Sequence, residues 1–120
     1  MGIPPITVTV SNPADSTRRW EGRFVVDTGA VDCIIPGKRL REIGIQPIGK
    51  RSYELADGRE ISLEVAVARI EFMGNFVGTT VIFGPDNAEP ILGTTALASA
   101  GIEIDPRNNR LKQLPSVRLK

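Results

Sequence analysis

The stretch that decides the fold is FVVDTGA, residues 24–30. A short, apolar and β-branched run of this kind predicts a buried strand. The strand ends in a carboxylate, Asp27, followed by a hydroxyl at Thr28 and a glycine at Gly29. Burial of a charge is costly unless a partner satisfies it, so we interpret Asp27 as a functional residue. The alternative is a tight turn in which the Asp27 side chain only caps backbone amides.

A second motif, PILGTTAL, covers residues 90–97. Two apolar residues, Ile91 and Leu92, are followed by Gly93 and then by a segment that predicts a short helix over 94–100. By composition alone, an Asp-Thr-Gly triplet is expected about once in several thousand residues, so it is weak evidence alone. Two linked motifs in this order are much stronger evidence.

The two motifs resemble those of the retropepsin-like aspartic proteases, in which a hydrophobic-hydrophobic-Gly step accompanies the Asp-Thr-Gly loop. The resemblance covers about residues 7–111, nearly the whole chain, and the sequence is similar to the small microbial, non-viral members. Pepsin-like enzymes carry two Asp-Thr-Gly loops in a chain several times as long. Because this chain of 120 residues has one such triplet, the resemblance implies a homodimer.

The activity that the resemblance implies is that of an aspartic endopeptidase. A water molecule would be activated by two Asp27 carboxylates, one from each chain, to hydrolyse a peptide or protein substrate. Thr28 would bond to the partner's loop across the dimer axis, and Ala30 would keep the floor of the cleft small. Gly29 would let the backbone approach the carboxylates. The step from Ile91 to Gly93 would support the loop from behind.

Two further places are candidate substrate contacts. Asp32 follows the loop where several members of the resembled family have carboxylates that hold substrate backbone amides, although Val31 intervenes here. Ala56, Asp57 and Gly58 form the tip of a predicted hairpin, since Asp-Gly between alternating segments is a strong turn signal. By resemblance this hairpin is the flap that covers the substrate, and the alternative is an ordinary surface hairpin.

The remaining pattern is that of short strands with frequent turns and little helix. Strands are predicted at 6–10, 20–26, 33–35, 51–56, 59–72 and 76–83, and on both sides of 105–109, with a short helix over 36–43. Apolar residues change from odd to even positions at Ala68 and Arg69, which predicts a bulge or a bend. This pattern predicts an all-β, small, closed, barrel-like lobe with a short helix near the C-terminus. We expect a single domain over 1–120, with a core over about 6–112.

Composition excludes several other classes of function. The chain has no histidine and one cysteine, Cys33, which excludes Ser-His and Cys-His catalysis, His-ligated metals, an intrachain disulfide and a cysteine zinc cluster. We therefore expect neither a metal nor a cofactor. The net charge is +1, with 15 basic and 14 acidic residues and 5% aromatic residues, so nucleic acid is not an expected partner.

The expected location is the cytoplasm, without a membrane partner. No apolar run reaches the roughly 18 residues that a membrane span needs, and the N-terminal residues lack the features of a signal peptide. The chief alternative to the endopeptidase is a catalytically silent dimeric β domain that binds peptides or proteins in the same cleft. The intact Asp-Thr-Gly favours activity, because a binding module has no need to place two like charges face to face.

Overall fold

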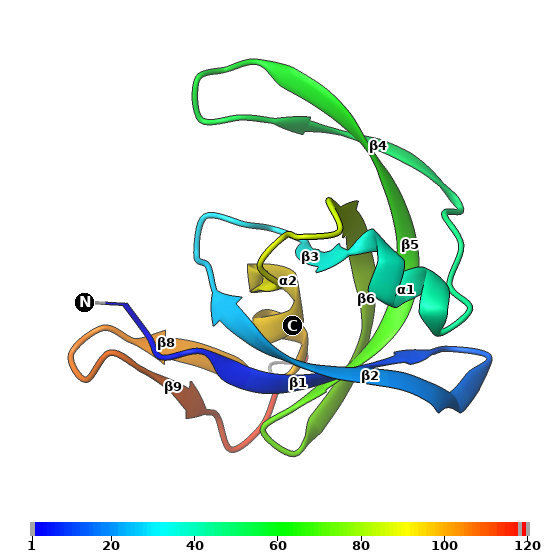
Figure 1. Ribbon diagram of the computed structural model, residues 1–120. Coiled ribbons are helices and arrows are strands. Elements are labelled where there is room, and N and C mark those ends of the chain that lie inside the picture. Colours follow the sequence, from blue (N-terminus) through cyan, green and yellow to red (C-terminus); the bar gives the residue numbers. More distant parts are fainter. Residues whose placement is uncertain (1, 118, 120) are drawn as a thin grey trace.

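The computed structural model describes residues 2–117 and 119 (Figure 1). In chain order, the described elements are β1 (Ile6–Asn12), β2 (Asp15–Val26), β3 (Cys33–Pro36), α1 (Gly37–Glu42), β4 (Gly49–Glu54), β5 (Glu60–Phe72), β6 (Asn75–Gly84), β7 (Ile91–Leu92), α2 (Thr94–Ser99), β8 (Ile102–Asp105) and β9 (Arg110–Gln113). Strands dominate, as the sequence predicts. Neither helix among the described residues is long and apolar enough to span a membrane.

Six strands close into a barrel. Their order is β1-β2-β7-β3-β6-β5, and β5 pairs again with β1 through Val10 opposite Ile70. The β4 strand extends the sheet beyond β5, and β8 and β9 form a separate two-stranded sheet. Closure satisfies the backbone groups that open sheet edges leave unpaired. The prediction of an all-β closed lobe is therefore confirmed.

The barrel interior holds the apolar residues that alternate along the strands. On β1, Val8 and Val10 point inward while Thr7 and Thr9 lie on the outer face. The largest fully buried side chains are Phe24, Ile35, Leu40, Ile70 and Leu92. Phe24 stands three residues before Asp27, so the end of β2 is fixed by the core, and the loop that follows starts from a rigid base.

The start of β2 differs from the prediction. The sequence predicts this strand from about residue 20, but it begins at Asp15, immediately after a tight turn in which Asn12 pairs with Asp15. The additional segment, Asp15–Arg19, is polar and exposed. It is held by backbone pairing with β1, so no apolar alternation marks it in the sequence.

The long strand β5 carries the hairpin that projects from the barrel (Figure 1). Its first part pairs with β4, from Glu60 opposite Glu54 to Val65 opposite Gly49. From Val65 onward it pairs with β6 in unbroken register to Phe72. The two-stranded ribbon made by β4 and the first part of β5 therefore extends away from the barrel, with a tip at residues 55–59.

The bulge predicted at Ala68 and Arg69 is not present. β5 curves as one continuous strand instead, so only the predicted bend is found (Figure 1). Ala66, Ala68 and Ile70 face the core from even positions, whereas the odd-numbered apolar residues lie mostly in the projecting ribbon. The change in parity therefore reflects two different environments on opposite faces of β5. Its even-numbered residues face the barrel core, and the odd-numbered residues of the ribbon face the space beneath it.

Candidate active site

The loop after β2 holds the carboxylate on which the sequence prediction centres. The Asp27 N–H donates to the Leu92 carbonyl (3.2 Å), and the Ala30 N–H donates to the Asp27 carbonyl (3.2 Å). The Asp27 Oδ1 accepts the Gly29 N–H at 2.8 Å, and the side chain is half-buried. A simple tight turn would make the same Asp27–Gly29 bond, so the case for a site rests on the surroundings of the loop.

A rigid step supports the loop from behind. Strand β7 lies parallel to β2, with Leu92 opposite Val26, and also pairs with β3. Beyond it, the Thr94 N–H donates to the Ala30 carbonyl (2.8 Å) and the Thr95 N–H to the Val31 carbonyl (3.1 Å). The first turn of α2 thus binds the carbonyls of the loop and fixes its path.

Gly93 is the point of closest approach between this step and the loop. A Cβ atom at this position would lie 2.6 Å from the Val31 carbonyl oxygen and 2.7 Å from the Asp32 carbonyl carbon. Both neighbours are backbone atoms, which cannot move aside as a flexible side chain can. Only glycine fits here without displacing the loop. The structure therefore places Leu92 and Gly93 directly against the loop that carries Asp27, whereas Ile91 pairs with the strands on either side of it, β2 and β3.

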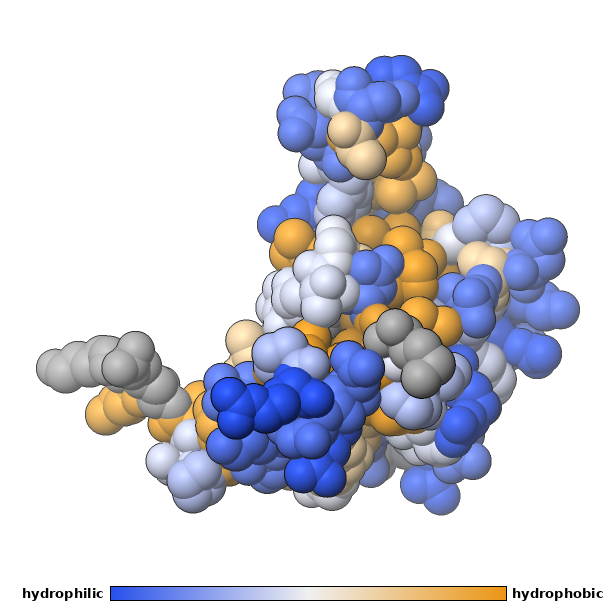
Figure 2. Space-filling view, turned by 90° about the vertical axis from the view of Figure 1, so that its left-hand side faces the viewer, coloured by the Kyte–Doolittle hydropathy of each residue, from blue (hydrophilic) through white to orange (hydrophobic). Residues whose placement is uncertain are grey.

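A cavity of about 540 Å³ lies between the loop and the projecting ribbon. The space-filling view shows apolar surface in the hollow below the polar tip of this hairpin (Figure 2). The residues that line it are Gly29, Ala30, Val31, Asp32, Ile34, Arg51, Ser52, Tyr53, Glu54, Leu55, Ile61, Leu63 and Ile82. Most of these side chains are apolar. Asp27 is not among these residues, but its Oδ1 atom accepts the N–H of Gly29, which is one of them.

Asp32 lies in the wall of this cavity, with only 4% of its surface exposed. Its Oδ2 atom accepts a hydrogen bond from the Tyr53 hydroxyl (2.7 Å) and one from Arg51 Nη1 (3.3 Å). Burial, followed by the hydrogen bond to Asp32, raises the pKa of Tyr53 to about 12. The hydroxyl therefore remains a proton donor throughout the physiological pH range. The predicted substrate contact at Asp32 stays a prediction.

Arg51 and Tyr53 are the site residues that sequence reasoning missed. Both lie on β4 and are separated by one residue, so they point to the same face of the strand. This spacing is the signal in the sequence, but their partner Asp32 lies on a distant segment. The spacing of Arg51 and Tyr53 alone does not identify Asp32 as their partner, because that contact depends on how the ribbon folds over the loop.

The hairpin tip is held together by its own local bonds. Asp57 accepts the Arg59 N–H (3.0 Å) and pairs with Arg59 Nε (2.7 Å), and these contacts lower the pKa of Asp57. Gly58 has a φ of +89°, and its N–H donates to the Leu55 carbonyl (2.9 Å). Ala56, Asp57 and Gly58 are exposed and outside the cavity lining of the single chain.

Cys33 follows Asp32 but faces the core, with 1% of its surface exposed. Burial raises the pKa of the Cys33 thiol to about 11, although a hydrogen bond from the Gly93 backbone acts in the opposite direction. A thiol that keeps its proton at neutral pH is a poor nucleophile and a poor metal ligand. Within residues 2–117 and 119, no three His, Cys, Asp or Glu side chains lie close enough to hold a metal ion.

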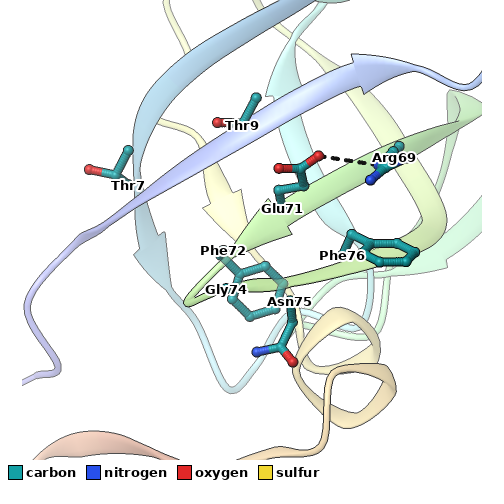
Figure 3. A pocket seen from close by; sticks show the side chains of 8 residues that line it. All are labelled: Thr7, Thr9, Arg69, Glu71, Phe72, Gly74, Asn75 and Phe76. Atoms are coloured by element: carbon teal, nitrogen blue, oxygen red, sulfur yellow. Dashed lines mark ion pairs between the residues drawn. The ribbon is translucent and has the colours of Figure 1, made fainter. Parts of the chain in front are cut away.

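A second hollow lies on the outer face of the sheet (Figure 3). In it, Arg69 pairs with Glu71 at 3.2 Å, and its guanidinium lies 4.4 Å from the centre of the exposed Phe76 ring. The charged groups of the hollow thus contact one another. The hollow shares no lining residue with the cavity beneath the ribbon, so we place the candidate active site at the loop.

Comparison with known proteins identifies the family of the chain. Residues 18–99 match the family described as "gag-polyprotein putative aspartyl protease". The chain belongs to this family. The matched segment includes the Asp27 loop, the projecting hairpin and the step at Gly93, so the resemblance to retropepsin-like aspartic proteases is confirmed. Family membership makes the chain a protease of this general class.

A solved structure supports the fold of this family member. The solution structure of simian foamy virus (mac) protease matches with a TM-score of 0.55 at 17% sequence identity. The match covers 78% of this chain and 90% of that chain. None of the curated proteins compared with the chain matches it.

The contact at Gly93 predicts a loss of stability in Gly93→Ala. Because the added methyl group would meet fixed backbone, we expect the free energy of unfolding, measured by urea denaturation, to fall by about 1–3 kcal/mol. Gly78→Ala is the matched control, since a Cβ there meets no atom within 4 Å. Equal effects of the two substitutions would contradict the role of Gly93.

The burial of Cys33 predicts a decline in stability at alkaline pH. The folded thiol keeps its proton up to a pKa of about 11, whereas the ordinary value is 9.0. Between these values the unfolded state binds fewer protons, so stability falls as pH rises through this window, by roughly 3 kcal/mol in total. Urea unfolding of wild type and Cys33→Ala at about pH 8 and pH 11 measures this contribution. A decline of equal size in both proteins would assign it to other groups.

Proposed function

We propose that this protein is a homodimeric aspartic endopeptidase, with an active site built from the Asp27 carboxylates of two copies. The proposal rests on the different burial and hydrogen bonding of the two carboxylates near the loop. Asp27 is half-buried at the end of β2, whereas Asp32 is buried and bonded to Tyr53 and Arg51. Because Asp32 already accepts hydrogen bonds from Tyr53 and Arg51, we assign the second carboxylate of the active site to a second copy, related by two-fold symmetry.

Peptide hydrolysis by such a pair needs only water and the two carboxylates, so no metal or cofactor is required. The ionised Asp27 takes a proton from the attacking water, and the protonated Asp27 of the second copy donates to the carbonyl oxygen of the scissile bond. Two like charges about a hydrogen bond apart do not both ionise readily. The two carboxylates therefore share one proton.

The residues around Asp27 suit this role. The Gly29 N–H orients Oδ1, and a Cβ at Gly29 would stand 3.3 Å from that oxygen. Thr28 is exposed in the single chain, which leaves its hydroxyl available to the partner's loop. Ala30 contributes a small side chain to the cavity. Together these features orient the carboxylate and keep the space above it open.

The substrate class follows from the cavity and the ribbon. A mostly apolar cavity of about 540 Å³ suits an apolar side chain of an extended peptide or protein segment. The ribbon would cover that segment, with Ala56, Asp57 and Gly58 at its tip as candidate contacts and Asp32 as a further one in the wall. We assign this activity to a single domain over residues 1–120, with its core over about 6–112.

Substitution of Asp27 tests the proposed catalytic carboxylate. We expect Asp27→Asn to lower kcat for cleavage of a mixed peptide library by about a thousandfold or more, because the amide neither takes nor shares the proton. Asp15→Asn is the matched control, since Asp15 is exposed in the distant β1–β2 turn. A pepstatin-type transition-state mimic should suppress the wild-type activity.

Circular dichroism and sedimentation would verify that the Asp27→Asn protein remains folded and dimeric. Activity of that variant within a few-fold of wild type would overturn the catalytic assignment. Equal and negligible turnover by folded, dimeric wild type and variant would instead favour the silent peptide-binding domain.

Dilution tests whether the active site needs two chains. Because each site would need two chains, activity per protomer should fall on dilution through the dimer dissociation constant. Peptidase assays over a dilution series, paired with sedimentation at the same concentrations, measure this dependence. Constant specific activity at concentrations where the protein sediments as a monomer would contradict a shared site.

A further inference from the structure

The hydrogen bonds at Asp32 join two parts of the fold that are far apart in sequence. The carboxylate belongs to the segment that follows the active-site loop, whereas both of its donors, Tyr53 and Arg51, belong to β4 in the projecting ribbon. A buried carboxylate is stable only when donors satisfy it. These contacts therefore connect the ribbon to the loop through a group that cannot be left unpaired without a cost.

The loop side of this connection is rigid. The backbone of Val31 and Asp32 packs against Gly93, and the Val31 carbonyl accepts the Thr95 N–H at 3.1 Å. The position of the Asp32 side chain is therefore fixed by the same step that supports the Asp27 loop. A group bonded to Asp32 is held at a defined place relative to Asp27.

The ribbon side has little other support. In the register of the ribbon, Arg51 pairs with Leu63 and Tyr53 with Ile61, and all four residues line the cavity. Among the described residues, one further ion pair joins the ribbon to the body, Arg41 with Glu64 at 3.6 Å, and both of its side chains are half-exposed. Exposed pairs of this kind typically contribute about 1 kcal/mol or less.

We propose that Tyr53 and Arg51, through Asp32, form a clasp that holds the ribbon at a fixed height above the active-site loop. Tyr53 provides the shorter bond, 2.7 Å against 3.3 Å for Arg51. Both are positioning residues, because they act on the placement of the ribbon and not on the reacting atoms. The catalytic consequence rests on the proposed peptidase activity, whereas the clasp itself does not.

Tyr53→Phe tests the clasp, because it removes one hydroxyl and keeps the ring. Ser62→Ala is the matched control: it removes a hydroxyl from the exposed face of the same ribbon, outside the cavity lining. Spin labels at Glu60→Cys and Glu103→Cys would report the distance from ribbon to body by pulsed electron resonance, with labelled protein diluted into unlabelled protein. Buried Cys33 would not take the label.

We expect a narrow distance distribution in the wild-type background and in Ser62→Ala, and a broader and longer one in Tyr53→Phe. A distribution unchanged by Tyr53→Phe would overturn the clasp. This readout needs no catalytic activity, so it decides the clasp even if the wild type cleaves nothing and the proposed function fails.

Kinetics with a cleavable peptide test the positioning role. Without the hydrogen bond of Tyr53 the ribbon is less ordered, so substrate binding must order it at a cost in free energy. We therefore expect kcat/KM of Tyr53→Phe to fall about tenfold, mainly through a higher KM. Ser62→Ala should match wild type. A broadened distance distribution with kcat/KM and KM unchanged would overturn the positioning role in catalysis.

Discussion

The contact that the rest of the site depends on is the approach of Gly93 to the backbone of Val31 and Asp32. It brings β7 and the first turn of α2 against the loop, so that backbone amides of α2 bind the loop carbonyls. The same contact fixes both acids of the site, Asp27 on one side and Asp32 on the other. Their environments differ: Asp27 is partly open to solvent, whereas Asp32 is buried and accepts hydrogen bonds from two donors of the ribbon.

Barrel closure and ribbon projection divide the chain into a rigid and a less supported part. The six barrel strands satisfy one another's backbone groups, whereas the end of the ribbon is a two-stranded structure, which is marginal by itself in water. Such a division would suit the proposed peptidase, because its carboxylates need a fixed frame while a ribbon that covers the substrate has to open. The hydrogen bonds at Asp32 join the two parts, beside the continuous strand β5 and the ion pair of Arg41 with Glu64.

Local patterns in the sequence were sufficient for most of the fold. The alternation of Val8 and Val10, the Asp57-Gly58 turn, and the two motifs around Asp27 and Gly93 each predict a feature from residues close together in the chain. The early start of β2 was missed because its first residues are held by backbone pairing. The pairing of Asp32 with Tyr53 was missed because it depends on how distant segments meet in space. For β5, the change in parity predicts a bulge or a bend without deciding between them, because the path of the strand also depends on distant segments.

The ring of strands has a consequence for how the chain reaches its native state. Its closing seam joins β1 to β5 through Thr9, Val10 and Ser11, opposite Glu71, Ile70 and Arg69. These segments come from opposite halves of the chain, so the entropy cost of closing a long loop precedes any gain from pairing. We therefore expect the seam to form late in folding. Until it does, β1 and β5 present unpaired edges, which makes slow folding and intermolecular association the main hazards during synthesis of this domain.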